Sequence, residues 1–270
     1  MSDLPEIAER DATGRVAELY ADIRAVVGAP FVALIYRVLA ANGGLEAAWA
    51  SLRPNLADPA TAPAAAELVR VGVGDDGVRI PTAALRAAGV DDADLPALRS
   101  TCAAYDHTNS RNLLAVTALL HADGDAAPAL PGPDAGADEP PAAPAFDLVP
   151  MVPLAGLAQA TRALLDELSR PLVLPGDAAL VPSLFRHFAD RPCLLALLAT
   201  ALEPARASGA VEARGAAVEA RARELAAALP HAVAPVADPA VRAVLERFGF
   251  TISRMIVVGG LLGRALDAEP

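Results

Sequence analysis

Two stretches far apart in the chain, TNSRNLLAVTALL at residues 108–120 and TISRMIVVGGLL at residues 251–262, share one outline. Each places Thr, Ser and Arg at matching positions and then continues into an aliphatic run. Ala and Leu dominate the first run, and these residues lose little side-chain freedom in a helix. The pair of stretches therefore indicates two corresponding helices and an all-α fold.

Two further pairs of segments repeat in the same order. RVLA at residues 37–40 is matched by RHFA at 186–189, and the pattern Leu19…Asp22-Ile23 is matched by Leu164…Glu167-Leu168. The three pairs lie 143 to 149 positions apart, which indicates an internal duplication. We therefore predict two tandem helical repeats, residues 1–121 and 154–270, that superpose about a pseudo-twofold axis.

Residues 122–153 separate the two repeats. This segment holds eight prolines among Gly, Ala and Asp. Proline removes a backbone donor and disfavours helix in the residue before it, so the pattern predicts an extended Pro/Ala-rich linker. Elsewhere apolar residues at helical spacing recur, for example in residues 15–27 and 214–229.

Composition narrows the function classes. The 270 residues are 54% apolar and only 4% aromatic, and the net charge of −11 argues against binding to nucleic acid. Cys102 and Cys193 stand far apart and neither belongs to a C-x-x-C motif, which argues against a disulfide framework and dithiol chemistry. The first residues lack an apolar signal region and no apolar run is long enough to span a membrane, so we expect a cytoplasmic protein.

Motifs for cofactors and metals are absent from the sequence. It contains no Walker loop, G-x-G-x-x-G, H-E-x-x-H or G-x-S-x-G motif, and its four histidines lack ligand spacing. We therefore expect no cofactor and no metal, and chemistry, where present, that depends on side chains alone.

The densest polar cluster is YDHTNSRN at residues 105–112, inside an otherwise apolar helical stretch. Asp106 and Asn109 are three residues apart and share a helix face, and Tyr105 can share it too. The cluster is either a solvated interruption of the helix or a place where Asn109 projects into a cavity to position a water or a substrate. The position matching Asn109 in the second repeat is Ile252, which favours a local role for the asparagine.

A second candidate is VPSLFRH at residues 181–187. Ser183 at a helix start has the character of an N-cap, although its hydroxyl would also suit a carboxylate ligand. His187 follows four residues later and could lie beneath the serine, or it could be an ordinary surface or core histidine.

These segments carry a family resemblance that spans nearly the whole chain. The order and spacing of residues 21–24, 29–33, 37–40, 108–119 and 182–192 resemble the group I 2-haloacid dehalogenases, the DehI family. The resemblance implies a pseudo-dimer of AhpD-like helical architecture, with the active site between the repeats. It also implies hydrolysis of the carbon–halogen bond of short 2-haloalkanoic acids by direct attack of water, with inversion and without a cofactor.

The resemblance assigns roles to individual residues. The asparagine that holds the water matches Asn109, and the substrate-binding residues match Phe31, Leu34 and Ser183. The family's catalytic aspartate, which follows the serine, falls on Leu184, and leucine cannot accept a proton. By geometry Asp106, one turn before Asn109, is the best substitute base in the sequence.

Two functions remain open, and so does the question of whether the protein is an enzyme. One is a 2-haloacid hydrolase with a relocated base. The other is an inactive family member that uses the inter-repeat cavity as a small-ligand site or interaction scaffold. AhpD-like thiol peroxidases share the architecture but need a paired-cysteine motif that this chain lacks. The expected partner is a small carboxylic acid, and a homodimer is among the assemblies that the sequence allows.

Overall fold

The computed structural model describes residues 5–73, 78–122, 144–174 and 180–267, and this part of the chain contains helices and no strands, as expected for an all-α protein. The first half contributes η1 (Glu9–Asp11), α1 (Gly14–Val27), α2 (Leu34–Ala41), α3 (Leu45–Ala57), α4 (Thr61–Val73), α5 (Thr82–Ala87) and α6 (Leu95–His121). The second half contributes α7 (Gln159–Ser169), η2 (Arg170–Leu172), α8 (Ser183–Arg186), α9 (Pro192–Ala207), α10 (Ala210–Ala227) and α11 (Pro239–Ala265).

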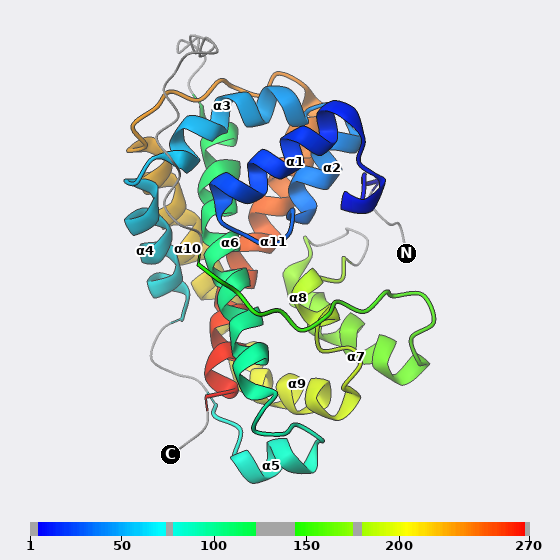
Figure 1. Ribbon diagram of the computed structural model, residues 1–270. Helices are drawn as coiled ribbons and strands as arrows, with labels where there is room; N and C mark the ends of the chain where they lie inside the picture. The colour runs from blue at the N-terminus through cyan, green and yellow to red at the C-terminus, as the bar shows by residue number, and fades with distance from the viewer. Residues whose placement is uncertain (1–4, 74–77, 123–143, 175–179, 268–270) are drawn as a thin grey trace.

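Helices α6 and α11 form the centre of the molecule. They are the two long helices that contain the repeated stretches, they run in opposite directions, and they share the most extensive helix–helix contact (Figure 1). The polar cluster at residues 105–112 does not interrupt α6, because Thr108 and Ser110 direct their hydroxyls to carbonyls one turn back in the same helix. The interpretation of this cluster as a solvated break is therefore wrong.

The two halves are interleaved around this centre. Helix α4 of the first half packs against α11 of the second, and α10 of the second half packs against α6 of the first. The short helices also contact the opposite half: α2 contacts α11, and α8 contacts α6. The order of helices in each half suits a duplication, and the pseudo-twofold superposition stays a prediction.

By length and composition, one described helix, α11, could cross a membrane, and α9 with α10 pass the same test as a pair bent by 75°. In α11, however, 78% of the most apolar window is buried inside the protein. This is the behaviour of a core helix, whose apolar side chains are covered by neighbouring helices.

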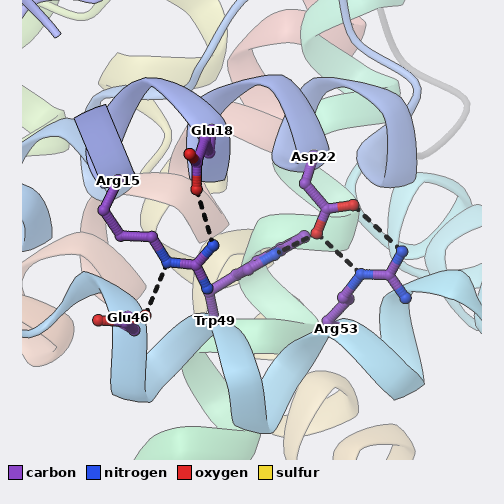
Figure 2. Close-up of polar contacts among 6 residues, drawn as sticks. All are labelled: Arg15, Glu18, Asp22, Glu46, Trp49 and Arg53. Carbon is purple, nitrogen blue, oxygen red and sulfur yellow. Dashed lines mark hydrogen bonds and ion pairs between the residues drawn. The ribbon is translucent and has the colours of Figure 1, made fainter. Parts of the chain in front are cut away.

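Polar contacts fix the outer helices α1 and α3 to each other (Figure 2). Asp22 accepts hydrogen bonds from the Trp49 indole at 2.7 Å and from Arg53 at 2.8 and 3.1 Å. Burial alone would raise the pKa of the Asp22 carboxyl, but the bonds from Arg53 and Trp49 outweigh it and lower the pKa. Arg15 extends the contact to Glu46 at 2.7 Å. These bonds give Asp22, in the segment at residues 21–24, a structural role.

The described end of the predicted linker is fastened to the body of the protein by hydrogen bonds. Residues 144–153 contain no helix, and the rest of the linker up to residue 143 lies outside the described residues apart from Ala122. The Val149 amide donates to Thr101 Oγ1 at 3.0 Å, and the Val152 amide donates to the Arg186 carbonyl at 3.1 Å. Val149 is buried. This segment is thereby held against both α6 and α8.

Close approach of α4 to α11 depends on glycine. A Cβ on Gly260 would lie 2.2 Å from Val73 Cγ2, whereas a Cβ on Gly263 would meet its nearest neighbour, Cys102 Cβ, at 3.8 Å. We expect Gly260→Ala to lower the free energy of unfolding by about 1–3 kcal/mol, the usual cost of overpacking. Gly263→Ala, the matched control, should instead raise it by up to about 1 kcal/mol because alanine favours helix. Urea unfolding of both variants tests this, and equal effects would contradict it.

Candidate functional site

A cavity of about 240 Å³ lies where α2, α6, α8 and α11 meet. Residues of both halves line it, and most of them are apolar. Its volume is below the roughly 300–1,000 Å³ of pockets for drug-sized molecules, so it suits a small ligand. The described lining residues are Glu9, Phe31, Val32, Ala33, Leu34, Ile35, Arg37, Tyr105, Asn109, Asn112, Leu148, Met151, Leu180, Pro182, Ser183, Leu184, His187, Phe248, Thr251, Ile252 and Met255.

Five of the six residues predicted for the site line this cavity. Phe31 comes from the loop before α2, and Leu34 is the first residue of α2. Asn109 comes from α6, and Ser183 and Leu184 come from α8. Ile252, the position that matches Asn109 in the second half, lines the same cavity from α11. Segments about 150 residues apart in the sequence thus meet at one place, where the two halves adjoin.

Asp106, the sixth predicted residue, is not among the described residues that line the cavity. Its Oδ1 lies over Gly259 of α11, where a Cβ would be only 2.6 Å away, and the Leu184 side chain reaches the same point at 3.9 Å. Among the described residues, no group forms a hydrogen bond with this buried oxygen. Burial raises the pKa of the Asp106 carboxyl to about 7. Asp106 therefore lies at the helix crossing, next to Leu184.

The start of α8 differs from the predicted N-cap. Ser183 is the first residue of the helix, Pro182 is the capping residue, and the serine makes no capping hydrogen bond. The helix has only four residues, so its free amides offer little support for an anion. Ser183 instead lines the cavity together with Tyr105 and lowers the pKa of the Tyr105 phenol, against the larger effect of burial, which raises it.

The lining also contains polar residues that were not predicted as site residues, among them Tyr105, Asn112, His187 and Arg37. Tyr105 and Asn112 belong to the same face of α6 as Asn109, at helical spacing, and this stripe could have been found in the sequence. Asn112 is buried and its Oδ1 has no hydrogen-bond partner among the described residues, so it offers an acceptor to a ligand. The sequence alone does not distinguish His187 from an ordinary surface or core histidine. Arg37 enters the sequence analysis only as part of the repeated segment at residues 37–40.

Charged groups at the cavity are few. The described lining contains one arginine, Arg37, which pairs with Glu6 at 3.2 Å, and one carboxylate, Glu9. The two Glu9 oxygens accept from the Val32 amide at 2.8 Å and from Arg24 at 2.7 Å. Glu9 is thereby held in the cavity wall by structural bonds, which leaves it poorly suited to abstract a proton.

Tyr105 and His187 form the most tightly connected polar pair in the cavity. The Tyr105 hydroxyl and His187 Nε2 are 3.1 Å apart, and His187 Nδ1 is hydrogen-bonded to the Val149 carbonyl. The Phe31 ring stacks on Tyr105 with 5.0 Å between centroids. The pair is therefore held from two sides, by Phe31 of the loop before α2 and by Val149 of the linker segment. Within the described chain, no cluster of three or more His, Cys, Asp or Glu side chains could hold a metal ion.

The comparisons identify the fold. No family model matches the chain, and no curated protein matches it. Among solved structures, a D-2-haloacid dehalogenase mutant matches with a TM-score of 0.79 at 19% identity, over 98% of this chain and 96% of that one. A D-2-haloacid dehalogenase in complex with L-LA matches with a TM-score of 0.78 at 19% identity, over 98% and 97% of the two chains. The chain therefore has the fold of the D-2-haloacid dehalogenases.

Proposed function

We propose that this protein is a hydrolase of the 2-haloacid dehalogenase type that takes a short 2-substituted carboxylic acid into the cavity between its halves. The observation that carries the proposal is the gathering of Phe31, Leu34, Asn109 and Ser183 around one small cavity. Apolar walls suit the carbon chain and the halogen of such an acid, and a few polar groups fix its orientation. Arg37 supplies a positive charge toward the carboxylate.

The chemistry follows from what the side chains can do. Asn109 holds a water by its amide, and the water attacks C2 of the acid from the side opposite to the halogen. The C–O bond forms as the C–halogen bond breaks, and the halide leaves with the electron pair. We propose no cofactor and no metal for this step, and place the protein, as a member of the group I (DehI) family, in the cytoplasm.

A second candidate function is binding of the acid without hydrolysis. Leu184, fully buried at the position where the resemblance expects the catalytic aspartate, favours this alternative. General-base assistance contributes typically about 10²–10⁴-fold to a rate, so its loss would leave a binding protein with little turnover.

Halide release from a panel of 2-chloro and 2-bromo acids, measured together with calorimetric binding of the same acids, tests the proposal. We expect binding of 2-chloropropionate and slow but measurable halide release, above the rate in buffer. Binding without release from any acid would support the second candidate. If no acid binds and no halide is released, both candidate functions are contradicted.

A further inference from the structure

The proposed hydrolase needs a group that accepts the proton of the attacking water, and Leu184 cannot do so. Tyr105 and His187 line the same cavity as Asn109, from α6 and from the residue directly after α8. Tyr105 is 7% exposed and His187 is 5% exposed, so both are largely shielded from bulk water. Tyr105 and Asn109 lie one helical turn apart on the same face of α6, so a water held by Asn109 is within reach of the phenol.

The hydrogen bond to Val149 determines which imidazole nitrogen carries the proton. A carbonyl oxygen can only accept, so in the neutral ring Nδ1 carries the hydrogen and donates it to Val149. Nε2 then presents its lone pair to the cavity side and accepts from the Tyr105 hydroxyl at 3.1 Å. The Tyr105 oxygen keeps lone pairs that can accept a hydrogen bond from a water in the cavity.

The surroundings keep this chain of hydrogen bonds in its uncharged form. Burial lowers the pKa of the His187 imidazole, the bond to Val149 opposes this, and Arg186 lowers it further. Burial raises the pKa of the Tyr105 phenol, while Ser183, Arg37 and Arg186 act in the opposite direction. The charged groups that face the pair are thus Arg37 from α2 and Arg186 from α8, with Glu9 engaged in the cavity wall. At neutral pH this chain of hydrogen bonds therefore ends at His187 Nε2, which carries no proton.

We propose that Tyr105 and His187 act as a proton relay that takes the place of the missing carboxylate, an inference that rests on the proposed function. As water attacks C2, its proton moves to the Tyr105 oxygen and the Tyr105 proton moves to His187 Nε2. The products are the hydroxy acid, free halide and an imidazolium at His187, which then returns its proton to solvent. Tyr105 contacts the water, and His187 acts through Tyr105.

Kinetics of four single variants test the relay. Tyr105→Phe keeps the ring stacked on Phe31 and removes only the hydroxyl. His187→Asn retains a donor for Val149 and removes the basic Nε2, because a carboxamide does not take up a proton at these pH values. We expect each to lower kcat/KM for 2-chloropropionate at least tenfold. The controls are Tyr36→Phe, which removes a buried hydroxyl without a hydrogen-bond partner among the described residues, and His107→Gln, which alters a histidine outside the described cavity lining. Both should stay within twofold of the native protein.

The pH profile and the imidazole spectrum separate a relay from a structural role. Native kcat/KM should fall at acidic pH, because protonated His187 cannot accept, and His187→Asn should lose this dependence. Since burial lowers the pKa of the His187 imidazole, the fall should lie at lower pH than for an ordinary histidine. In ¹⁵N-histidine NMR spectra, the signal lost in His187→Asn should show a protonated Nδ1 and a free Nε2, and Tyr105→Phe should shift Nε2.

Three results would decide against the relay. Halide release that is equal in Tyr105→Phe, His187→Asn and the controls would overturn the relay and leave the proposed function standing. A protonated Nε2 in the native protein at neutral pH would overturn the relay whether or not halide is released. Absence of halide release from every acid would overturn the proposed function and the relay with it.

Discussion

Leu184→Asp should increase halide release from 2-chloropropionate by about 10- to 100-fold over the native protein. A carboxylate at this position would accept the proton of the water directly, and general-base assistance is worth typically about 10²–10⁴-fold. The gain should stay below the upper limit because no neighbouring groups have been selected to orient the new carboxylate. The variant should also be less stable, since an unpaired carboxylate is costly among apolar side chains. Initial rates of halide release at neutral pH measure the effect.

Asp106 should influence the result, because its carboxylate lies close to the side chain of residue 184. Leu184 and the Asp106 carboxylate both lie within 4 Å of the Cβ position of Gly259, so the new carboxylate would stand close to an existing one. Two carboxylates that share a site raise the pKa of one of them, which weakens the base. The double variant Leu184→Asp/Asp106→Asn should therefore be faster than Leu184→Asp alone. Leu184→Ala is the matched control: it removes bulk without adding a carboxylate, and a comparable gain there would identify Asp106 as the base instead.

Asp106→Asn alone should change how the stability of the protein depends on pH. Burial raises the pKa of this carboxyl from 3.8 to about 7, so the folded protein retains a proton that the unfolded chain has released. Native stability should therefore fall as the pH rises from about 4 to about 7, by about 4 kcal/mol in total. The asparagine variant should lack this decline and be the more stable protein at pH 8, by about 1–3 kcal/mol once the cost of burying the new amide is included.

Urea unfolding of both proteins at pH 5 and pH 8 measures the difference. Asp94→Asn on the same helix serves as a control of opposite sign, because the bonds from Arg191 and from the Asp91 amide lower the pKa of Asp94 to about 2. Asp94 contributes stability that is present at neutral pH and is lost as the pH falls from about 4 toward 2. Parallel pH curves for native protein and Asp106→Asn would show that the Asp106 carboxyl titrates normally.

The sequence predicted the helices and most of the cavity better than it predicted the chemistry. Helical periodicity and the repeated stretches located α6 and α11, and the resemblance assembled Phe31, Leu34, Asn109, Ser183 and Leu184, which do line one cavity. The helix predictions depend on local spacing, which a sequence displays directly. The set of cavity residues came from the resemblance.

The features that the sequence did not predict depend on contacts between distant segments. That Asp106 lies over Gly259 follows from how α6 crosses α11, and periodicity within one helix does not say which residue of another helix covers it. The same holds for His187, whose tautomer depends on a carbonyl in the linker segment, 38 residues earlier. Ser183 begins α8 instead of capping it because Pro182 takes the capping position.

The interleaving of the halves has a consequence for the order of events during synthesis. Helices α4 and α6 are complete at residue 121, but the helices that cover them, α10 and α11, begin at residues 210 and 239. At about 5–20 residues per second, the ribosome needs roughly 7–29 s to extend the chain from residue 121 to the end of α11 at residue 265. During this interval the nascent first half exposes to solvent the apolar surface that α10 and α11 later cover. The chain is thus most in need of chaperone protection when it is about half made, and its native core closes only as the last helix emerges.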